Sequence, residues 1–396
     1  MAGTRGRPAD SGGAGQAADK RRRTMLNWQD KARALSAELD ALGVLDPAWR
    51  AAFEDVPRHL FVPSFYRNDN SFVDGTHPEM HAEWLSAVYS DESLVTQQIA
   101  IPDTDSLRPT SSSTKPSLMS RMLGMLDVAD GHTVMEIGTG TGYNAALLSH
   151  RLGGDRVASI DIDPALVEQA RVRLKEAGFN PFLTAGDGAH GIRSRAPFDR
   201  VIATCAVPAI PPPWVDQLAD QGIIVTDVRA ETFSALVTAT KIAPDVVQGR
   251  FHSTPGHFMW LRADAGNPQR DGGKRDFVFN IDDARRSVTT FDPAILRDHD
   301  FGFVLALCMP DITMSNGLIN TDVYVVRTGD GSWAEVDATT RVTTQNGARS
   351  VWDEVRAAAR RWAELGRPER SRFGLTVTSS GEQHIWLDRP DNVFTG

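Results

Sequence analysis

The feature that most constrains the fold is an alternation of short apolar runs with amphipathic stretches, which begins near residue 133. The apolar runs read "TVMEIG", "RVASID", "FLTAGD", "FDRVIATCA" and "GIIVTDV", and helical stretches follow Gly142 and Pro164 and surround Trp214. Such alternation builds a mostly parallel sheet with helices on both faces. The sequence therefore predicts a Rossmann-like α/β core over residues 131–265, with "SALVTATKI" and "HFMWLRA" as closing strands.

A glycine-rich loop follows the first of these predicted strands. The pattern "VMEIGTGTGYN" places Glu136, Gly138, Gly140 and Gly142 between a strand and a helix. Glycines allow the backbone to turn sharply and to approach a ligand closely. A dinucleotide loop would read G-x-G-x-x-G, but Tyr143 occupies its last position, and the Gly-Lys-Ser/Thr of a P-loop is absent. A pyrophosphate or triphosphate ligand is therefore disfavoured.

Acidic residues stand at the ends of the next two predicted strands. Asp161 ends the second strand, and Asp187 precedes Gly188 at the end of the third. A carboxylate at the first position can accept both ribose hydroxyls, and one at the second can accept an adenine amino group. Thr204, near the end of the fourth strand, is expected to face the ligand crevice. Together, the glycine loop and the two acids describe an adenosine site, which S-adenosyl-L-methionine fits. Either acid taken alone would be interpreted as a helix cap or a loop charge.

The segments before the core carry helical signals. Residues 1–23 lack periodicity and are predicted to be a disordered leader, in which Lys20-Arg21-Arg22-Arg23 is a solvated tail. Residues 24–130 are predicted to hold an N-terminal helical region and a substrate segment. Within them, Asp46 and Pro47 mark a helix start.

The segments after the core indicate a further unit. Residues 266–283 are polar and Gly-rich and are predicted to be a linker, and residues 284–396 a separate α+β domain. In that domain "FGFVLALCM" and "TDVYVVRTG" are predicted strands. A helix capped by Ser350 is predicted up to Leu365, followed by the hairpin "FGLTVTSSGEQHIWLD".

A run of hydroxyl residues lies just before the core, in "RPTSSSTKPSLMSRM". Ser and Thr before a proline-opened helix are common caps, so Ser113 or Thr114 is expected to cap a helix that starts at Pro116. A flexible linker is the competing interpretation. Because the adenosine site follows directly, we favour substrate contact, with the run at a helix N-terminus that also lines a pocket.

Bulk composition excludes several classes of protein. The formal net charge of −9 disfavours nucleic acid as a partner. Cys205 and Cys308 are too few for a disulfide framework or a four-thiolate zinc site. His59, His81 and His190 show no metal-ligand spacing, so no metal is expected. No apolar run reaches about 18 residues and no secretory signal is visible, which predicts a cytoplasmic protein without a membrane partner.

These motifs resemble the protein-L-isoaspartate O-methyltransferase family. The resemblance covers roughly residues 45–265 and rests on "DVPRHLFVP", "VMEIGTGTGY", "SIDIDPALVEQAR" and "APFDRVIATCAVPAIPPPWVDQLADQGIIV". It implies a class I S-adenosylmethionine-dependent methyltransferase fold and an esterified carboxylate. In the family, a Thr-Ile-Ser-x-Pro-like segment lines the carboxylate site.

The matching segment here is Ser112-Ser113-Thr114-Lys115-Pro116. By the resemblance, Thr114 stands at the family's active-site serine, Ser112 replaces its threonine, and Ser113 replaces an apolar residue. All three are therefore candidate catalytic residues, and Lys115 is expected to point to solvent.

The longer hydroxyl run and the extensions resemble a bacterial branch of the family associated with ribosomally made peptides. That branch implies esterification of an aspartate in a cyclised precursor peptide, followed by aspartimide and in some systems isoaspartate. The alternatives are an isoaspartyl repair methyltransferase, a non-catalytic peptide-binding module and, remotely, a nicotinamide oxidoreductase, which Tyr143 disfavours.

Overall fold

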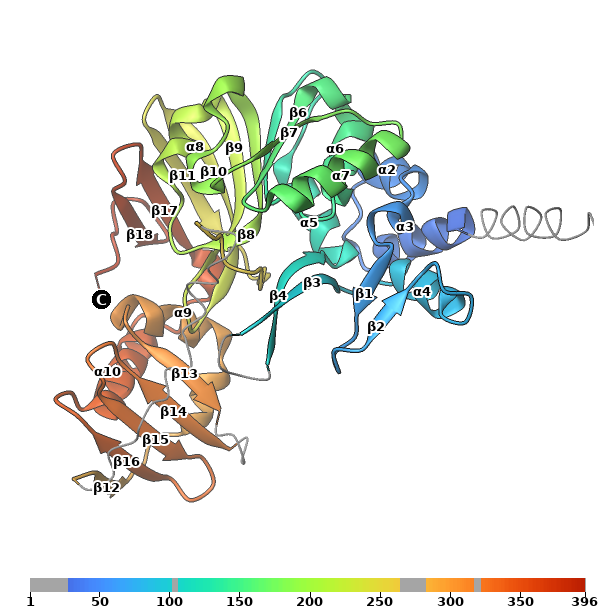
Figure 1. Cartoon of the computed structure of the whole chain (residues 1–396). Helices are drawn as coiled ribbons and strands as arrows, with labels where there is room; N and C mark the ends of the chain where they lie inside the picture. Colours follow the sequence, from blue (N-terminus) through green and yellow to red (C-terminus); the bar gives the residue numbers. More distant parts are fainter. Residues whose placement is uncertain (1–27, 102–105, 264–282, 317–321, 396) are drawn as a thin grey trace, which may run out of the picture. The chain divides into compact units, whose positions relative to one another are not determined.

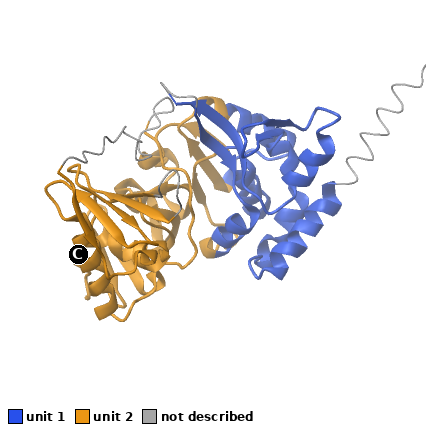
Figure 2. Cartoon of the chain, turned by 90° about the horizontal axis from the view of Figure 1, so that it is seen from below, with its two compact units in different colours: residues 1–124, 140–155, 168–181 blue, residues 125–139, 156–167, 182–396 orange. Residues whose placement is uncertain are grey.

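The computed structural model describes residues 28–101, 106–263, 283–316 and 322–395. The predicted leader, and the predicted linker apart from its last residue, lie outside these described residues. The chain divides into two compact units, which Figure 2 distinguishes by colour. Unit 1 comprises residues 1–124, 140–155 and 168–181, and unit 2 comprises residues 125–139, 156–167 and 182–396.

Unit 2 contains a nine-stranded sheet of order β18-β17-β11-β10-β9-β8-β5-β6-β7 (Figure 1). Its parallel half consists of β5 (Val134–Ile137), β6 (Val157–Asp161), β7 (Phe182–Ala185), β8 (Phe198–Val207) and β9 (Leu218–Arg229). All four residues of β5 are buried, as expected for a central parallel strand covered on both faces. The predicted Rossmann-like core is confirmed.

The other half of this sheet is antiparallel. It consists of β10 (Ser234–Ala243), β11 (Val246–Phe251), β17 (Phe373–Thr378) and β18 (Gln383–Leu387). β11 was not predicted, and "HFMWLRA" contributes only an isolated bridge from Trp260 to Ala206. The predicted C-terminal hairpin is present, but it extends the large sheet through β11 instead of standing in a separate domain.

A second sheet of unit 2 is five-stranded and antiparallel, with order β12-β16-β15-β14-β13. Its strands are β12 (Arg285–Val288), β13 (Thr313–Asn316), β14 (Val323–Arg327), β15 (Trp333–Asp337) and β16 (Val342–Asn346). Helix α10 (Val351–Glu364) packs on this sheet and confirms the predicted helix. Ser350 is at its N-cap position, but its side chain makes no capping bond and accepts from Arg285.

The prediction of a strand at "FGFVLALCM" is wrong, because these residues form helix α9 (His299–Cys308). A short apolar run has no periodicity that separates a buried helix from a buried strand. Asp298 favours the helix here, because its carboxylate accepts the N–H groups of Asp300 and Phe301 and caps the helix. The ring of Phe303 on α9 lies 4.8 Å from that of Phe251 in β11.

Unit 1 holds an unpredicted four-stranded antiparallel sheet of order β2-β1-β3-β4. Its strands are β1 (Ser64–Tyr66), β2 (Phe72–Asp74), β3 (Leu94–Ala100) and β4 (Leu107–Ser113). Three-residue strands such as β1 and β2 are too short to show alternation in the sequence.

Unit 1 also contains helices that come before, between and after these strands in the sequence. Residues 28–41 are helical, and the others are η1 (Pro47–Trp49), α2 (Arg50–Asp55), α3 (Arg58–Phe61), α4 (His81–Val88), α5 (Pro116–Leu126), α6 (Tyr143–Leu152) and most of α7 (Pro164–Glu176). The predicted start at Asp46 and Pro47 is confirmed, because the Asp46 carboxylate accepts the N–H of Ala48. No helix within the described residues is both long and apolar enough to span a membrane.

Candidate functional site

The glycine loop after β5 begins in unit 2, where two buried hydroxyl groups link it by hydrogen bonds to Glu136. The Ser159 hydroxyl donates to the Glu136 carboxylate at 2.6 Å, and it accepts in turn from the Thr139 hydroxyl at 2.6 Å. Glu136 is fully buried at the end of β5. Because a buried carboxylate must be hydrogen-bonded, this chain holds the start of the loop in one conformation.

Gly138 is required where it stands. Its φ of +95° lies in a region that side chains disfavour, and a Cβ there would lie 2.8 Å from the Thr204 hydroxyl oxygen. That hydroxyl donates to the carbonyl oxygen of Gly138 at 2.8 Å. Thr204, predicted to face the ligand, therefore holds the loop from β8, and its contact with a cofactor stays a prediction.

The two acids predicted for adenosine binding stand at the ends of neighbouring parallel strands. Asp161 ends β6 opposite Ala185 of β7, and its backbone carbonyl accepts the N–H of Gly186 at 2.8 Å. Asp161 is 8% exposed, whereas the Asp187 carboxylate caps a short 3-10 helix, η3 (Gly188–His190), by accepting the N–H of Ala189. The cap role expected from the sequence is thus present at Asp187, and its contact with a cofactor stays a prediction.

Gly188 leaves no space for a side chain. A Cβ at this position would lie 2.5 Å from the Ile137 side chain, and the Gly188 carbonyl accepts from the indole of Trp214 at 2.8 Å. Cys205 on β8 is buried, and burial raises the pKa of its thiol far above the usual range. It therefore packs, as the sequence analysis expected, and does not act as a nucleophile.

The remainder of the glycine loop belongs to unit 1, where it lies against β4. A Cβ on Gly140 would lie 3.5 Å from the Ser111 hydroxyl and 3.9 Å from the Ser112 carbonyl. Gly142 precedes helix α6, whose first residue, Tyr143, is buried. The hydroxyl run and the part of the glycine loop from Gly140 onward are therefore neighbours within unit 1.

The first four residues of the hydroxyl run lie in strand β4, which was not predicted, and the helix predicted to start at Pro116 begins there as α5. Ser113 pairs with Leu94 and Ser112 with Val95 in the antiparallel ladder between β4 and β3. At the end of β4, Ser111 and Ser113 are buried and Ser112 between them is partly exposed, because successive side chains of a strand point to opposite faces. Thr114, directly after the strand, is also partly exposed. The sequence does not reveal this alternation, because these residues are all of the same polar type.

The helix after the run takes its cap from elsewhere. The N–H of Ser117 donates to the Asp91 carboxylate at 2.7 Å, so Asp91 caps the first turn of α5 in the place expected for Ser113 or Thr114. Lys115 is half exposed and forms an ion pair with the same carboxylate at 3.3 Å. Asp91 thereby fixes the junction between β4 and α5.

Arg58, which was not among the predicted site residues, binds the junction between β4 and α5. Its guanidinium is fully buried and donates to the carbonyls of Val88, Ser90, Glu92 and Thr114 and to the Ser113 hydroxyl. Burial lowers the pKa of this guanidinium. No carboxylate of the described residues lies within ion-pair distance of it, so a buried positive charge stands directly behind Ser113.

The aromatic ring of Tyr143 lies next to Arg58 in unit 1. The Arg58 guanidinium carbon lies 5.7 Å from its ring centroid, and the Phe61 ring lies 5.8 Å away. Burial raises the pKa of Tyr143 to about 12, so its phenol stays protonated at neutral pH. Its hydroxyl makes no hydrogen bond to any described residue.

The predicted site residues thus fall into two groups. Unit 2 brings together the predicted cofactor residues Glu136, Gly138, Asp161, Asp187, Gly188 and Thr204, and unit 1 brings Gly140 and Gly142 together with Ser112, Ser113 and Thr114. The carboxylates of Asp161 and Asp187 can accept from the hydroxyl and amino groups of a nucleoside, and the sequence of the glycine loop has no lysine or arginine to bind a phosphate. These residues fit an adenosine group and do not fit a polyphosphate.

The fold and these residues define a class I S-adenosylmethionine-dependent methyltransferase, a class whose cofactor is S-adenosyl-L-methionine. A solved structure titled protein-L-isoaspartate O-methyltransferase aligns with 90% of this chain and 100% of its own, with a TM-score of 0.53 at 23% identity. At that identity the likeness shows the fold alone.

The sequence comparisons identify the family. The model of the protein-L-isoaspartate(D-aspartate) O-methyltransferase family matches residues 30–255. A protein-L-isoaspartate O-methyltransferase of Archaeoglobus fulgidus is 34% identical over 45% of this chain and 68% of its own length. One of Xanthobacter autotrophicus is 36% identical over 50% and 78%. The chain belongs to the protein-L-isoaspartate(D-aspartate) O-methyltransferase family.

Proposed function

We propose that this protein is an S-adenosylmethionine-dependent carboxyl O-methyltransferase that esterifies an aspartate side chain of a ribosomally made, cyclised peptide. The ester then closes to an aspartimide, which can open to isoaspartate. The observation that carries the proposal is the hydroxyl strand β4, which lies against Gly140 of the glycine loop, with the partly exposed Ser112 near its end and the partly exposed Thr114 directly after it.

The cofactor would be held by the acids and the glycine loop. We assign the ribose hydroxyls to Asp161 and the adenine to the segment of Asp187 and Gly188, with Glu136 and Thr204 fixing the loop. When bound, S-adenosyl-L-methionine supplies a methyl group on a sulfonium centre. This chain's own residues must hold the cofactor and orient the acceptor carboxylate.

The acceptor carboxylate needs orientation and no general base. An aspartate with an ordinary pKa near 4 is ionised at neutral pH, so one of its oxygens attacks the methyl carbon directly. Hydroxyl donors can orient it without neutralising it in an ion pair, and in-line placement contributes several kcal/mol. Ser112 and Thr114 suit this role, whereas the Ser113 hydroxyl already accepts from Arg58.

Closure of the ester requires nothing further from the enzyme. The backbone N–H of the residue after the aspartate attacks the ester carbonyl, the C–O bond breaks, and methanol leaves with the amide proton. Relative to the starting peptide, the aspartimide has lost one water.

The second candidate function is repair of isoaspartyl proteins. It is favoured by the sequence relatives of Archaeoglobus fulgidus and Xanthobacter autotrophicus, which are protein-L-isoaspartate O-methyltransferases. The two functions share the cofactor site and the esterification. They differ in whether the carboxylate belongs to a normal aspartate of a constrained peptide or to an isoaspartate of any exposed chain.

A methylation assay separates the two functions. Purified protein is given S-adenosyl-L-methionine with a radioactive methyl group and three peptides: a thioether-cyclised peptide with one aspartate, its linear form, and its isoaspartyl form. We expect labelling of the cyclised peptide, and mass spectrometry should then show the loss of one water. Labelling of the isoaspartyl peptide alone would support repair instead.

Thr114→Ala is the matched variant for this assay. We expect it to keep its affinity for S-adenosyl-L-methionine in calorimetry and to lose methyl transfer. Lost cofactor affinity would mean that this segment is structural. No binding of S-adenosyl-L-methionine, or binding that Asp161→Ala and Asp187→Ala leave unchanged, would favour a non-catalytic binding module.

A further inference from the structure

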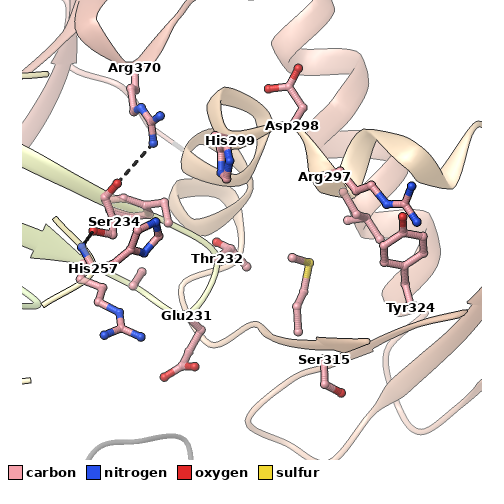
Figure 3. Close-up of a pocket in the computed structure, with 15 residues that line it drawn as sticks. Glu231, Thr232, Ser234, His257, Arg297, Asp298, His299, Ser315, Tyr324 and Arg370 are labelled. Atoms are coloured by element: carbon pink, nitrogen blue, oxygen red, sulfur yellow. Dashed lines mark hydrogen bonds between the residues drawn. The ribbon is translucent and has the colours of Figure 1, made fainter. Parts of the chain in front are cut away.

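A cavity of about 490 Å³ lies within unit 2, apart from the residues described above (Figure 3). It is formed by the turn between β9 and β10, the residues that enter α9, and strands β13 and β14. Figure 3 shows Arg370, Ser234 and His257 on one side and Arg297 and Tyr324 on the other, with His299 between them. Cavities of this size bind small ligands or a few residues of a peptide.

The lining of this cavity is rich in positive charge. Three arginines, Arg229, Arg297 and Arg370, line it together with two histidines, against the acids Glu231 and Asp298. Arg370 is buried and lies 3.6 Å from Asp300, and Arg297 lies 3.0 Å from Asp322.

Arg229 is held differently from the other two arginines. Its guanidinium donates to the carbonyl of Phe258 at 2.7 Å and lies 5.0 Å from the ring centroid of Trp260. No carboxylate among the described residues lies within 4 Å of it. The donors of Arg229 that the Phe258 carbonyl does not use are available to a ligand.

The positively charged side chains near the cavity also act on His257. Burial lowers the pKa of its imidazole, and the nearby Arg229, His299 and Arg370 lower it further. Its backbone N–H donates to the Ser234 hydroxyl at 2.8 Å, which fixes the backbone of His257 beside the cavity. The Arg229 guanidinium forms no ion pair within the described residues, so it can bind an anion.

The remaining wall is apolar with one unused polar group. Phe233, Leu296 and Met314 line it, and the Tyr324 hydroxyl is buried without a hydrogen bond to any described residue. Such a wall accepts an aliphatic or aromatic side chain next to the anion. Free inorganic anions offer no group to cover it.

A dianion is disfavoured at this site. The Asp298 carboxylate already accepts the first free N–H groups of α9, so the helix N-terminus is not available to a phosphate. That carboxylate also adds a negative charge to the lining. A monoanionic carboxylate suits the lining better.

We propose that this cavity binds a carboxylate-bearing, partly apolar segment of a peptide, with Arg229 as the principal contact. The segment is distinct from the aspartate that is esterified and serves to anchor the peptide. The inference rests on the proposed function only in assigning that segment to the peptide substrate.

The test is direct binding to the full chain. The probe is a fluorescein-labelled hexapeptide of alternating leucine and glutamate, which carries no aspartate, and its neutral counterpart has glutamine and a C-terminal amide. Fluorescence anisotropy should show binding of the acidic peptide and at least about tenfold weaker binding of the neutral one. Equal binding of both peptides would overturn the proposal.

Three variants locate the contact. Arg229→Gln should weaken binding of the acidic peptide about tenfold or more, and Arg297→Gln should weaken it less because Arg297 is paired with Asp322. Arg360→Gln, an exposed change on α10, should have no effect. Thermal unfolding checks each fold, and Arg297→Gln still tests the cavity if Arg229→Gln unfolds. Unchanged binding in a folded Arg229→Gln or, failing that, in Arg297→Gln would refute the site.

Competition identifies the source of the carboxylate. Unlabelled acidic peptide should displace the probe at lower concentration than free glutarate, and glutarate at lower concentration than inorganic phosphate. Either reversed order would overturn the assignment to a peptide carboxylate. Because this assay contains neither aspartate nor methyl donor, its failure is distinguishable from a failure of the methylation assay.

Discussion

The glycine loop and the hydroxyl strand are both runs of small residues, but they are held in place by opposite means. Gly138 adopts its conformation because no other residue tolerates a φ of +95° with the Thr204 hydroxyl 2.8 Å from the Cβ position. The strand β4 adopts its conformation because β3 pairs with it and Arg58, 55 residues before Ser113, binds it from behind. One conformation is encoded in the loop itself and the other in distant parts of the chain.

The largest expected effect tests the local encoding. Gly138→Ala should cost about 1–2 kcal/mol for the left-handed backbone and about 1 kcal/mol for the broken Thr204 bond. Since 1.4 kcal/mol is tenfold, cofactor affinity should fall about 100-fold in calorimetry.

Gly131→Ala is the matched control for this change. Gly131 has a φ of +89°, but no heavy atom lies within 4 Å of its Cβ position. It should therefore cost only the backbone term in thermal unfolding and leave cofactor affinity unchanged. Similar losses of affinity in both variants would show that backbone strain alone, and not the contact with Thr204, holds the loop.

The next effect tests the distant encoding. Arg58→Lys keeps the charge but cannot supply the same set of hydrogen bonds, so we expect a loss of about 3 kcal/mol in unfolding free energy. Methyl transfer should slow about 30-fold, mainly in kcat, because Ser112 and Thr114 lose their alignment, with cofactor affinity little changed.

Arg200→Lys controls for the loss of a buried arginine. Arg200 is 8% exposed and also donates to backbone carbonyls, those of Leu126, Asp127 and Asp199. It should lose similar stability without a matching loss of kcat. An equal loss of kcat in the two variants would remove the positioning role from Arg58.

This contrast explains which parts of the structure the sequence predicted. The loop and the acids at Asp161 and Asp187 were placed at strand ends because strand, glycines and acid follow one another along the chain. The strand character of β4 was not predicted, because its partner β3 and the bound Arg58 are remote in sequence and its four hydroxyl residues show no apolar alternation. For α9, the deciding residue was one carboxylate, Asp298, beside an apolar run that suits either structure.

A smaller effect should separate the two faces of β4. Thr114→Ala, at the partly exposed residue directly after β4, should change stability by less than about 0.5 kcal/mol and slow methyl transfer at least about tenfold. Ser113→Ala, on the buried face, should lose about 1–2 kcal/mol of stability, because the Arg58 guanidinium loses an acceptor, with transfer nearly unchanged. Chemical denaturation and the radioactive-methyl assay measure the two quantities. The opposite pattern would place the substrate on the Ser113 face.

The smallest effect concerns the pH dependence of the scaffold that holds Arg58. His59 follows Arg58 in α3, its Nδ1 lies 2.8 Å from the Tyr89 hydroxyl, and burial lowers its pKa to about 4. An unfolded histidine has a pKa near 6.5, so between about pH 4 and 6.5 the unfolded chain binds more protons than the folded one. Stability contributed by the neutral imidazole is therefore lost as the pH falls through this window.

From pH 6.5 to 5.5 this histidine should reduce the unfolding free energy by about 1 kcal/mol. His59→Gln should remove that part of the slope in denaturation experiments at the two pH values, whereas His190→Gln, whose imidazole is 80% exposed, should leave it in place. An unaltered slope in His59→Gln would mean that acid acts elsewhere. Since residues 136–143 contain no histidine, the same acidification should leave amide exchange in the glycine loop slow while it accelerates exchange in β4.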